Sequence, residues 1–238
     1  MAPLSNIAQW FNLYPSDSNL NLDEYSDEEK VDSTLFKQIV GSLRYLCNSR
    51  PDICYSVSVI SKFMNIPKKS HMTAAKRILR YVKGSMKFGL LFPTGMKKDS
   101  AELVSYSDSN WGGDKIDRRS TSGYVMLYNG ALISWCTKKH PVTALSTCEA
   151  EYIAETFSTC QVIWLDSVMK ELKCELKKPL KLLIDNKSAI SLVKNPISHG
   201  RSKHIESRFH FIREQVMNGM VKVIYYPTQE QLAEGFTK

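Results

Sequence analysis

The second half of the chain places strands and helices in an order that few folds accommodate. Strands are predicted at 103–107, 124–128, 131–135, 180–184 and 221–226, and helices over 148–172, from 187, over 204–217 and over 229–236. Asn129-Gly130 predicts a tight hairpin turn, and the apolar end of Leu180–Ile184 is typical of a central parallel strand. This order predicts an α/β fold that joins an antiparallel hairpin set to a parallel pair through crossover helices.

The preceding region, residues 31–92, is predicted to be mostly helical. Apolar residues recur at helical spacing at Leu35, Ile39, Leu43 and Leu46, and further helices are predicted over 53–64 and 72–84. The last of these is two-faced. Its apolar face is predicted to comprise Ala75, Ile78, Leu79, Val82 and Met86, and its basic face Lys76, Arg80, Lys83 and Lys87.

Charge is unevenly distributed along the 238 residues. The net charge of +8 combines −5 in residues 1–30, +10 in residues 31–100 and +3 in the rest. We therefore expect 1–30 to be a flexible acidic leader. The basic middle indicates either a nucleic-acid partner or a solvated helix face.

Several classes of protein are disfavoured by simple counts. No apolar run is long enough for a spanning helix, and the first 29 residues contain no Lys or Arg, so neither a membrane protein nor a secretory signal peptide is expected. The six cysteines form no CxxC pair, which argues against a thiolate zinc site and a disulfide scaffold. We expect an intracellular protein, cytoplasmic or nuclear.

Two acidic residues follow predicted strands. Asp108 ends the first strand and Asp185 ends the apolar strand, so parallel neighbours would bring both carboxylates to one edge of the sheet. Adjacent carboxylates repel unless a cation neutralises them, and oxygen ligands suit Mg²⁺ or Mn²⁺. The alternative is that each Asp caps the following helix.

The long helix offers two more acids with different expected roles. Ser146 and Glu149 fit a capping box, which gives Glu149 a structural role. Glu151 lies about 200° further around the helix and can face the sheet edge. Glu234 lies on the last predicted helix. The tryptophans Trp111, Trp135 and Trp164 are interpreted as core residues.

Specific motifs give the chain a family resemblance. Residues 101–238 resemble the ribonuclease H domain of copia-type retrotransposon polyproteins, in 106–113, 117–124, 133–135, 144–152, 184–189, 203–213 and 231–238. Residues 35–92 resemble the end of the reverse transcriptase of the same polyproteins, in 41–45, 50–53 and 74–84.

The resemblance implies a fold, an activity and a site. The fold would be a ribonuclease H-like mixed five-stranded sheet, an antiparallel three-strand meander plus parallel strands, flanked by helices and preceded by a small helical region. The chain would cleave the RNA strand of RNA–DNA hybrids with two Mg²⁺ or Mn²⁺ ions. The implied catalytic and metal-binding residues are Asp108, Glu151, Asp185 and Glu234.

Contacts with a hybrid are expected at three places. Ser109, Asn110 and Asn186 lie beside the acids, Arg201, His204 and Arg208 are spaced along one helix face, and Lys76, Arg80 and Lys83 form the basic stripe. Other parts of a Pol polyprotein are possible partners, and the oligomeric state is left open.

Departures from the family pattern keep alternatives open. Glu234 stands where the family has Asp, and the loop before it, Tyr226–Glu230, lacks the histidine of cellular ribonucleases H. The absence of a Tyr-x-Asp-Asp motif excludes polymerase activity by this chain. A weakened or inactive nucleic-acid-binding remnant is therefore an alternative. A third hypothesis is an RxLR-type effector, from Arg77-Ile-Leu-Arg80.

The expected organisation has four parts. They are a leader (1–30), a helical polymerase remnant from the connection or thumb region (31–92), a linker (93–100) and a ribonuclease H-like domain (101–238).

Overall fold

The computed structural model describes residues 15, 22, 27–94, 101–194 and 206–238, and side chains except those of 206–209. Two compact units are present, one within residues 3–90 and one within 91–238. The predicted linker lies mostly outside the described residues, as does most of the predicted leader. The assignment of the first unit to a polymerase remnant stays a prediction.

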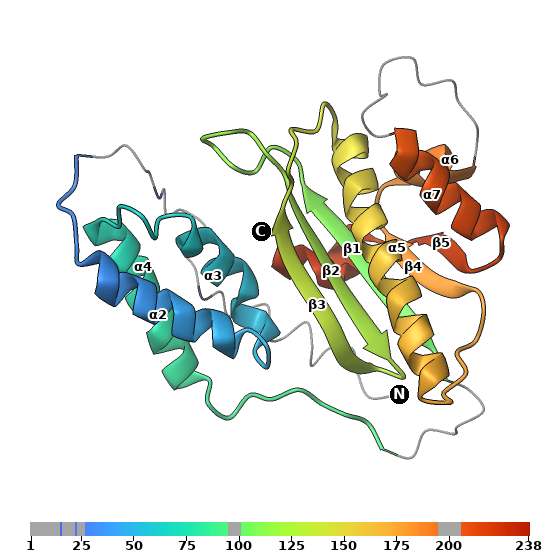
Figure 1. Cartoon of the computed structure of the whole chain (residues 1–238), viewed down its shortest axis with the longest axis horizontal. Helices are drawn as coiled ribbons and strands as arrows, with labels where there is room; N and C mark the ends of the chain where they lie inside the picture. The colour runs from blue at the N-terminus through green and yellow to red at the C-terminus, as the bar shows by residue number, and fades with distance from the viewer. Residues whose placement is uncertain (1–14, 16–21, 23–26, 95–100, 195–205) are drawn as a thin grey trace. The chain divides into compact units, whose positions relative to one another are not determined.

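The first unit is built from helices, as the apolar spacing predicts. Its elements are α2 (Ser33–Leu46), η1 (Pro51–Ile53), α3 (Cys54–Ser61) and α4 (Lys69–Gly84) (Figure 1). Helix α2 begins where the Asp32 carboxylate accepts a hydrogen bond from the Thr34 amide at 2.8 Å. Its buried face is Phe36, Val40 and Leu43, one position away from the predicted Leu35, which is exposed.

Helix α4 is amphipathic, with two corrections to its predicted apolar face. Ala75 and Ile78 are fully buried, whereas Leu79 is partly exposed and Met86, which lies beyond the end of the helix at Gly84, is exposed. The basic residues Lys76, Arg80 and Lys83 are exposed. The stripe is therefore accessible to solvent along the helix.

A buried ion pair fixes the turn between α2 and α3. Arg50 pairs with Asp52 at 2.5 Å, and the Tyr81 hydroxyl donates a hydrogen bond to the same carboxylate at 2.9 Å. The side chain of Arg50 also donates to the Ser85 hydroxyl at 2.6 Å. These bonds satisfy the buried charges and connect the turn to the end of α4.

The second unit is a mixed five-stranded sheet, as predicted. Its strands are β1 (Leu103–Asn110), β2 (Thr121–Tyr128), β3 (Ala131–Lys139), β4 (Leu180–Ile184) and β5 (Val221–Tyr225), in the order β3-β2-β1-β4-β5. β1, β2 and β3 are antiparallel neighbours, and β4 lies parallel to both β1 and β5. Asn129 and Gly130 both have positive φ, which confirms the predicted hairpin turn.

Helices cover the sheet. Helix α5 (Thr147–Glu171) packs against β1, and α6 (Lys187–Lys194) and α7 (Glu206–Met217) pack beside it. The short helix η5 (Leu232–Phe236), which follows η4 (Thr228–Glu230), lies against β1 and β2 on the side away from α5 (Figure 1). The core between α5 and the sheet includes Tyr152, Ile153 and Ile184, all fully buried.

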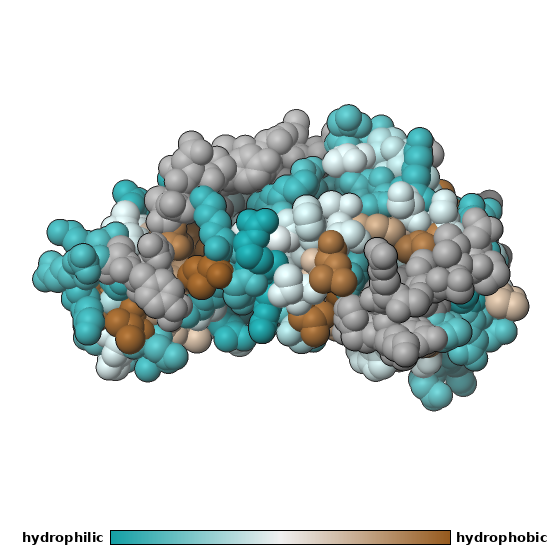
Figure 2. Space-filling model, turned by 90° about the horizontal axis from the view of Figure 1, so that it is seen from above, coloured by the Kyte–Doolittle hydropathy of each residue, from teal (hydrophilic) through white to brown (hydrophobic). Residues whose placement is uncertain are grey.

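The surface seen in Figure 2 is mostly hydrophilic, with small separate hydrophobic patches among the described residues. Two predicted core tryptophans, Trp111 and Trp164, are instead exposed. The Trp111 ring nitrogen donates to the Ala144 carbonyl at 3.0 Å, so that Trp111 connects two surface loops.

Among the described helices, none is both long and apolar enough to cross a membrane. No disulfide involves Cys136, Cys148, Cys160 or Cys174.

Candidate metal centre

Strand pairing brings the two predicted aspartates to the same edge of the sheet. In the parallel pair, Val104 is opposite Lys181 and Tyr106 is opposite Leu183. Continuing this register by two residues places Asp108 level with Asp185, directly after the end of β4. Asp108 itself lies within β1, which runs to Asn110, rather than after its end.

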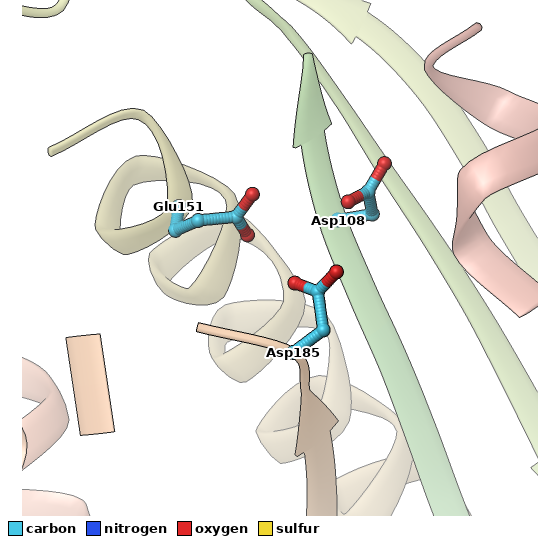
Figure 3. A group of neighbouring side chains, drawn as sticks. All are labelled: Asp108, Glu151 and Asp185. Atoms are coloured by element: carbon cyan, nitrogen blue, oxygen red, sulfur yellow. The ribbon is translucent and has the colours of Figure 1, made fainter. Parts of the chain in front are cut away.

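Helix α5 adds the third carboxylate. Ligand oxygens of Asp108, Glu151 and Asp185 all lie within 4.8 Å of one another. Figure 3 shows the three side chains converging from β1, α5 and the end of β4. The predicted approach of Glu151 to the sheet edge is therefore realised, and these three residues are called the acidic triad below.

Glu149 has the structural role that the capping box predicts. The Ser146 hydroxyl accepts from the Glu149 amide at 3.1 Å, and the Glu149 carboxylate accepts from the Leu145 amide at 2.9 Å. The carboxylate thus bonds to the amide of Leu145, the residue before Ser146, and not to that of Ser146 itself. Glu149 therefore stabilises the start of α5, whereas Glu151 belongs to the acidic triad.

Each carboxylate of the acidic triad accepts a hydrogen bond from the protein. The Thr237 hydroxyl donates to Asp108, the Thr228 hydroxyl donates to Asp185 at 2.8 Å, and the Ser109 amide donates to Glu151 at 3.1 Å. The second oxygen of Glu151 is buried and has no hydrogen-bond partner among the described residues. A buried carboxylate oxygen left in this way is available to a cation.

Burial and like charges disfavour ionisation of two members of the acidic triad, Asp108 and Glu151. Burial raises the pKa of Asp108; the hydrogen bond from Thr237 opposes this shift, and the charge of Asp185 adds to it. Burial, followed by the charges of Asp108 and Asp185, raises the pKa of Glu151 well above its usual value. Bringing these carboxylates together therefore costs free energy that a bound cation would offset.

The fourth predicted ligand, Glu234, is not part of this group. It lies on η5, and its carboxylate forms an ion pair with Lys238 at 2.9 Å. Burial lowers the pKa of Lys238, but its hydrogen bond with Glu234 and the charge of Asp108 outweigh this effect, so that the pKa is raised overall. Lys238 therefore brings a positive charge close to the acidic triad.

The predicted nucleic-acid contacts beside the triad make hydrogen bonds within the protein. Ser109 is buried, the Asn110 amide donates to the Thr237 carbonyl at 3.1 Å, and the Asn186 side chain caps α6 by accepting from the Ser188 amide at 3.0 Å. Arg201 and His204 lie outside the described residues. Arg208 lies in α7, but its side chain is not described.

The segment after β5 contains site residues that the sequence reasoning missed. Besides Thr228 and Thr237, the buried Gln231 side chain donates to the carbonyls of Ser107 at 3.0 Å and Leu183 at 3.3 Å. Gln231 thus bridges β1 and β4 just before their aspartates. The only sequence signal was that residues 231–238 belong to a matching motif, which does not say which side chains face the acids.

Glu155 was also missed. It lies one helical turn after Glu151 and is fully buried, and within the described ranges neither of its carboxylate oxygens has a hydrogen-bond partner. Burial raises its pKa to about 8.

Comparison with known proteins identifies the origin of the chain. It is 40% identical to the retrovirus-related Pol polyprotein from transposon RE1 of Arabidopsis thaliana over 217 residues. The aligned residues are 91% of this chain and 15% of the relative. It is also 40% identical over 204 residues to the corresponding polyprotein from transposon TNT 1-94 of Nicotiana tabacum, which covers 85% of this chain and 15% of the relative. The chain belongs to the copia-type retrotransposon Pol polyproteins. It spans about a seventh of the length of these relatives.

A third similarity concerns a protein with a different name. The chain is 42% identical over 127 residues to the secreted RxLR effector protein 161 of Plasmopara viticola, which covers 53% of this chain and 87% of that protein. The string Arg77-Ile78-Leu79-Arg80 lies inside α4, with Ile78 buried. In this copia-type segment the string is thus part of a packed helix, and the effector hypothesis stays a prediction.

No family model matches the chain. Solved structures with partial likeness include LC11-RNase H1 in complex with an RNA/DNA hybrid (TM-score 0.43, 11% identity, 57% of this chain and 94% of that one). They also include a foamy viral protease-reverse transcriptase in complex with double-stranded DNA (TM-score 0.48, 12% identity, 93% of this chain and 35% of that one). Likeness at this level supports no inference about activity.

Proposed function

We propose that this copia-type segment is a metal-dependent endonuclease that cleaves the RNA strand of RNA–DNA hybrids. The observation that carries the proposal is the acidic triad, three carboxylates from separate elements whose ligand oxygens lie within 4.8 Å of one another. Membership of the Pol polyproteins supports the choice of substrate.

The residues present fit a divalent cation. All three donors are carboxylate oxygens, which suit Mg²⁺ or Mn²⁺. The buried oxygen of Glu151, which has no hydrogen-bond partner in the part of the chain that the structure describes, would gain a bond to the cation. The proposed ligands are the acidic triad and, as a fourth, Glu234.

A pair of Mg²⁺ or Mn²⁺ ions bound there would stabilise charge on a scissile phosphate and favour ionisation of a water molecule. The protein supplies ligands that are held in place before substrate arrives. Hydrogen bonds from Ser109, Thr228 and Thr237 orient the carboxylates, and Gln231 fixes the two strands that carry the aspartates. A site held in this way needs little rearrangement on binding the substrate.

The test is cleavage of a labelled RNA–DNA hybrid with Mg²⁺. We expect cleavage of the RNA strand by the unaltered chain and its loss in Asp108→Asn, because an amide removes a charged ligand. Glu175→Gln, which changes an exposed acid in the loop between α5 and β4, is the matched control and should cleave normally. An unaltered chain that binds hybrid without cutting it would overturn the proposal.

A nucleic-acid-binding remnant without activity is the second candidate. It is favoured by one observation, that Glu234 is paired with Lys238 and lies outside the acidic triad. The two candidates differ in the same assay, because the remnant would bind the hybrid and leave it intact.

A further inference from the structure

Two threonines after β5 contact the two aspartates of the acidic triad. The Thr237 hydroxyl donates to Oδ2 of Asp108, and the Thr228 hydroxyl donates to Oδ2 of Asp185. Thr237 is fully buried, whereas the bond of Thr228 is exposed to solvent. A buried hydrogen bond to a charged oxygen is stronger and less exchangeable with water. The bond from Thr237 therefore restrains Asp108 more strongly than the bond from Thr228 restrains Asp185.

The position of Thr237 is itself fixed on several sides. Its carbonyl accepts a hydrogen bond from the Asn110 amide at 3.1 Å, and the preceding Phe236 carbonyl accepts one from the Thr137 hydroxyl at 3.0 Å. Phe236 is fully buried against Gly123 of β2. The hydroxyl of Thr237 is therefore presented to Asp108 by a packed segment.

The Thr237 hydroxyl has two acceptors within reach but only one proton. It contacts the Asp108 carboxylate and lies 3.0 Å from the Glu234 carbonyl. The charged acceptor is the stronger one, so the proton is directed to Asp108. One oxygen of Asp108 is then occupied, which restrains the orientation of the carboxylate, and the other oxygen is left for a cation bound by the acidic triad.

We propose that Thr237 is a positioning residue that orients Asp108 for divalent-cation binding. The inference rests on the proposed function, because it concerns the same metal centre. It adds to that function a residue that would touch neither the cation nor the nucleic acid. Hydrogen-bond partners of metal ligands commonly change metal affinity by about ten- to a hundredfold when they are removed.

The experiment measures Mn²⁺ binding to the full chain by calorimetry and by the electron paramagnetic resonance signal of free Mn²⁺. Thr237→Val keeps the shape but removes the hydroxyl, and we expect binding to weaken by roughly ten- to a hundredfold. Thr237→Ser keeps the hydroxyl, and we expect it to bind within about threefold of the unaltered chain. Thermal unfolding without metal checks that each variant is folded.

Thr156→Val is the matched control. It removes another threonine hydroxyl, one that donates to the Tyr152 carbonyl at 2.9 Å within α5 and touches neither the acidic triad nor the segment that carries Thr237, and it should leave Mn²⁺ affinity unchanged. Native affinity in a folded Thr237→Val chain would overturn the role of Thr237 and leave the metal centre standing. Equal loss in Thr237→Ser would assign the effect to packing and also overturn it. An unaltered chain that binds no Mn²⁺ would overturn both the positioning role and the proposed function.

Discussion

Helix α5 contains two buried carboxyl groups, Glu151 and Glu155, whose surroundings differ. Glu151 lies beside two aspartates and a donating amide, whereas neither carboxylate oxygen of Glu155 has a hydrogen-bond partner among the residues described by the structure. With its pKa raised to about 8, Glu155 is mostly protonated at neutral pH. It behaves as a neutral polar group one helical turn away from Glu151 of the acidic triad.

This burial makes stability depend on pH. The folded pKa of Glu155 lies above its ordinary value of 4.5, so folding binds a proton between these values. Its contribution to stability is therefore greatest below about pH 4.5 and declines as pH rises through about 8. We expect Glu155→Gln to raise the free energy of unfolding at about pH 9 by about 2–4 kcal/mol relative to the unaltered chain, with little change at about pH 4.

Urea unfolding at the two pH values measures this difference. The exposed Glu175→Gln is the control and should shift neither midpoint. A Glu155→Gln gain that is the same at both pH values would contradict the account, since a constant gain does not arise from deprotonation.

The reach of the Glu234 side chain can be tested by shortening it by one methylene group. Its carboxylate is engaged by Lys238 and lies outside the acidic triad. We expect Glu234→Asp to increase hybrid cleavage, by up to about a hundredfold if the present reach misplaces a ligand by about 1 Å. Cleavage rates at saturating Mg²⁺ measure the effect.

The control for this substitution is Glu230→Asp, the same shortening in η4. Rates for Glu230→Asp should match those of the unaltered chain. A Glu234→Asp rate that falls would show that the longer side chain is the better ligand here.

At the scale of elements, the sequence predicted the type and order of every strand and of most helices, and the differences lie at strand ends. β1 continues to Asn110 and β2 begins at Thr121, beyond the predicted 103–107 and 124–128. Most of these extra residues are polar, and the sequence pattern therefore predicted loops at these positions. Pairing of Asn110 with Thr121 in the antiparallel ladder overrides that local preference, because backbone hydrogen bonds between the strands do not depend on side-chain polarity.

A glycine in β2, Gly123, allows helix η5 to pack closely against the sheet. A Cβ built on Gly123 would lie 2.7 Å from Cβ of Phe236 and 2.9 Å from the Ala233 carbonyl oxygen. Only the absence of a side chain lets η5 approach this closely. The segment that carries Thr237 therefore depends on one position of β2.

We expect Gly123→Ala to push η5 off the sheet, lowering the free energy of unfolding by about 1–3 kcal/mol and weakening Mn²⁺ binding. Urea unfolding and Mn²⁺ titration measure the two effects. Gly41→Ala, where an added Cβ meets nothing within 4 Å, is the matched control in helix α2. It should stabilise by up to about 1 kcal/mol, as Ala replaces Gly within a helix. Unchanged stability and metal affinity in Gly123→Ala would contradict this role for η5.

At the scale of the whole molecule, the sequence predicted a helical region before an α/β region, and the structure has two compact units divided near residue 90. It predicted the meeting of the acidic triad because strand ends and helix spacing follow from local patterns. It did not predict the contacts of Thr228, Gln231 and Thr237, since these depend on how a distant segment folds back over the strands. Long-range packing of this kind leaves no periodic signal in a single sequence.

The basic stripe of α4 gives a prediction at this scale. Lys76, Arg80 and Lys83 are exposed in the first unit. We expect their combined replacement by Gln to weaken hybrid binding and to reduce the slope of log affinity against log salt by up to about 3, roughly one for each phosphate that a cation no longer neutralises. Binding measured over a range of salt concentrations checks this.

A triple replacement of Lys30, Lys37 and Arg44 by Gln is the matched control, because it removes the same charge from another exposed part of that unit. It should lower the overall attraction slightly and leave the slope nearly unchanged. Equal slopes for both triple variants would mean that net charge alone, rather than the α4 stripe, governs binding.

The closing of η5 over β1 and β2 also has a consequence for synthesis of the chain. The acidic triad is complete in the nascent chain once Asp185 is translated, but Thr228, Gln231 and Thr237 follow more than 40 residues later. Until that stretch has left the ribosomal exit tunnel, Asp108 and Asp185 lack the hydrogen bonds from Thr237 and Thr228. Competence to capture a cation would therefore arise only after the ribosome has passed Thr237, well after the last of the three carboxylates has been made.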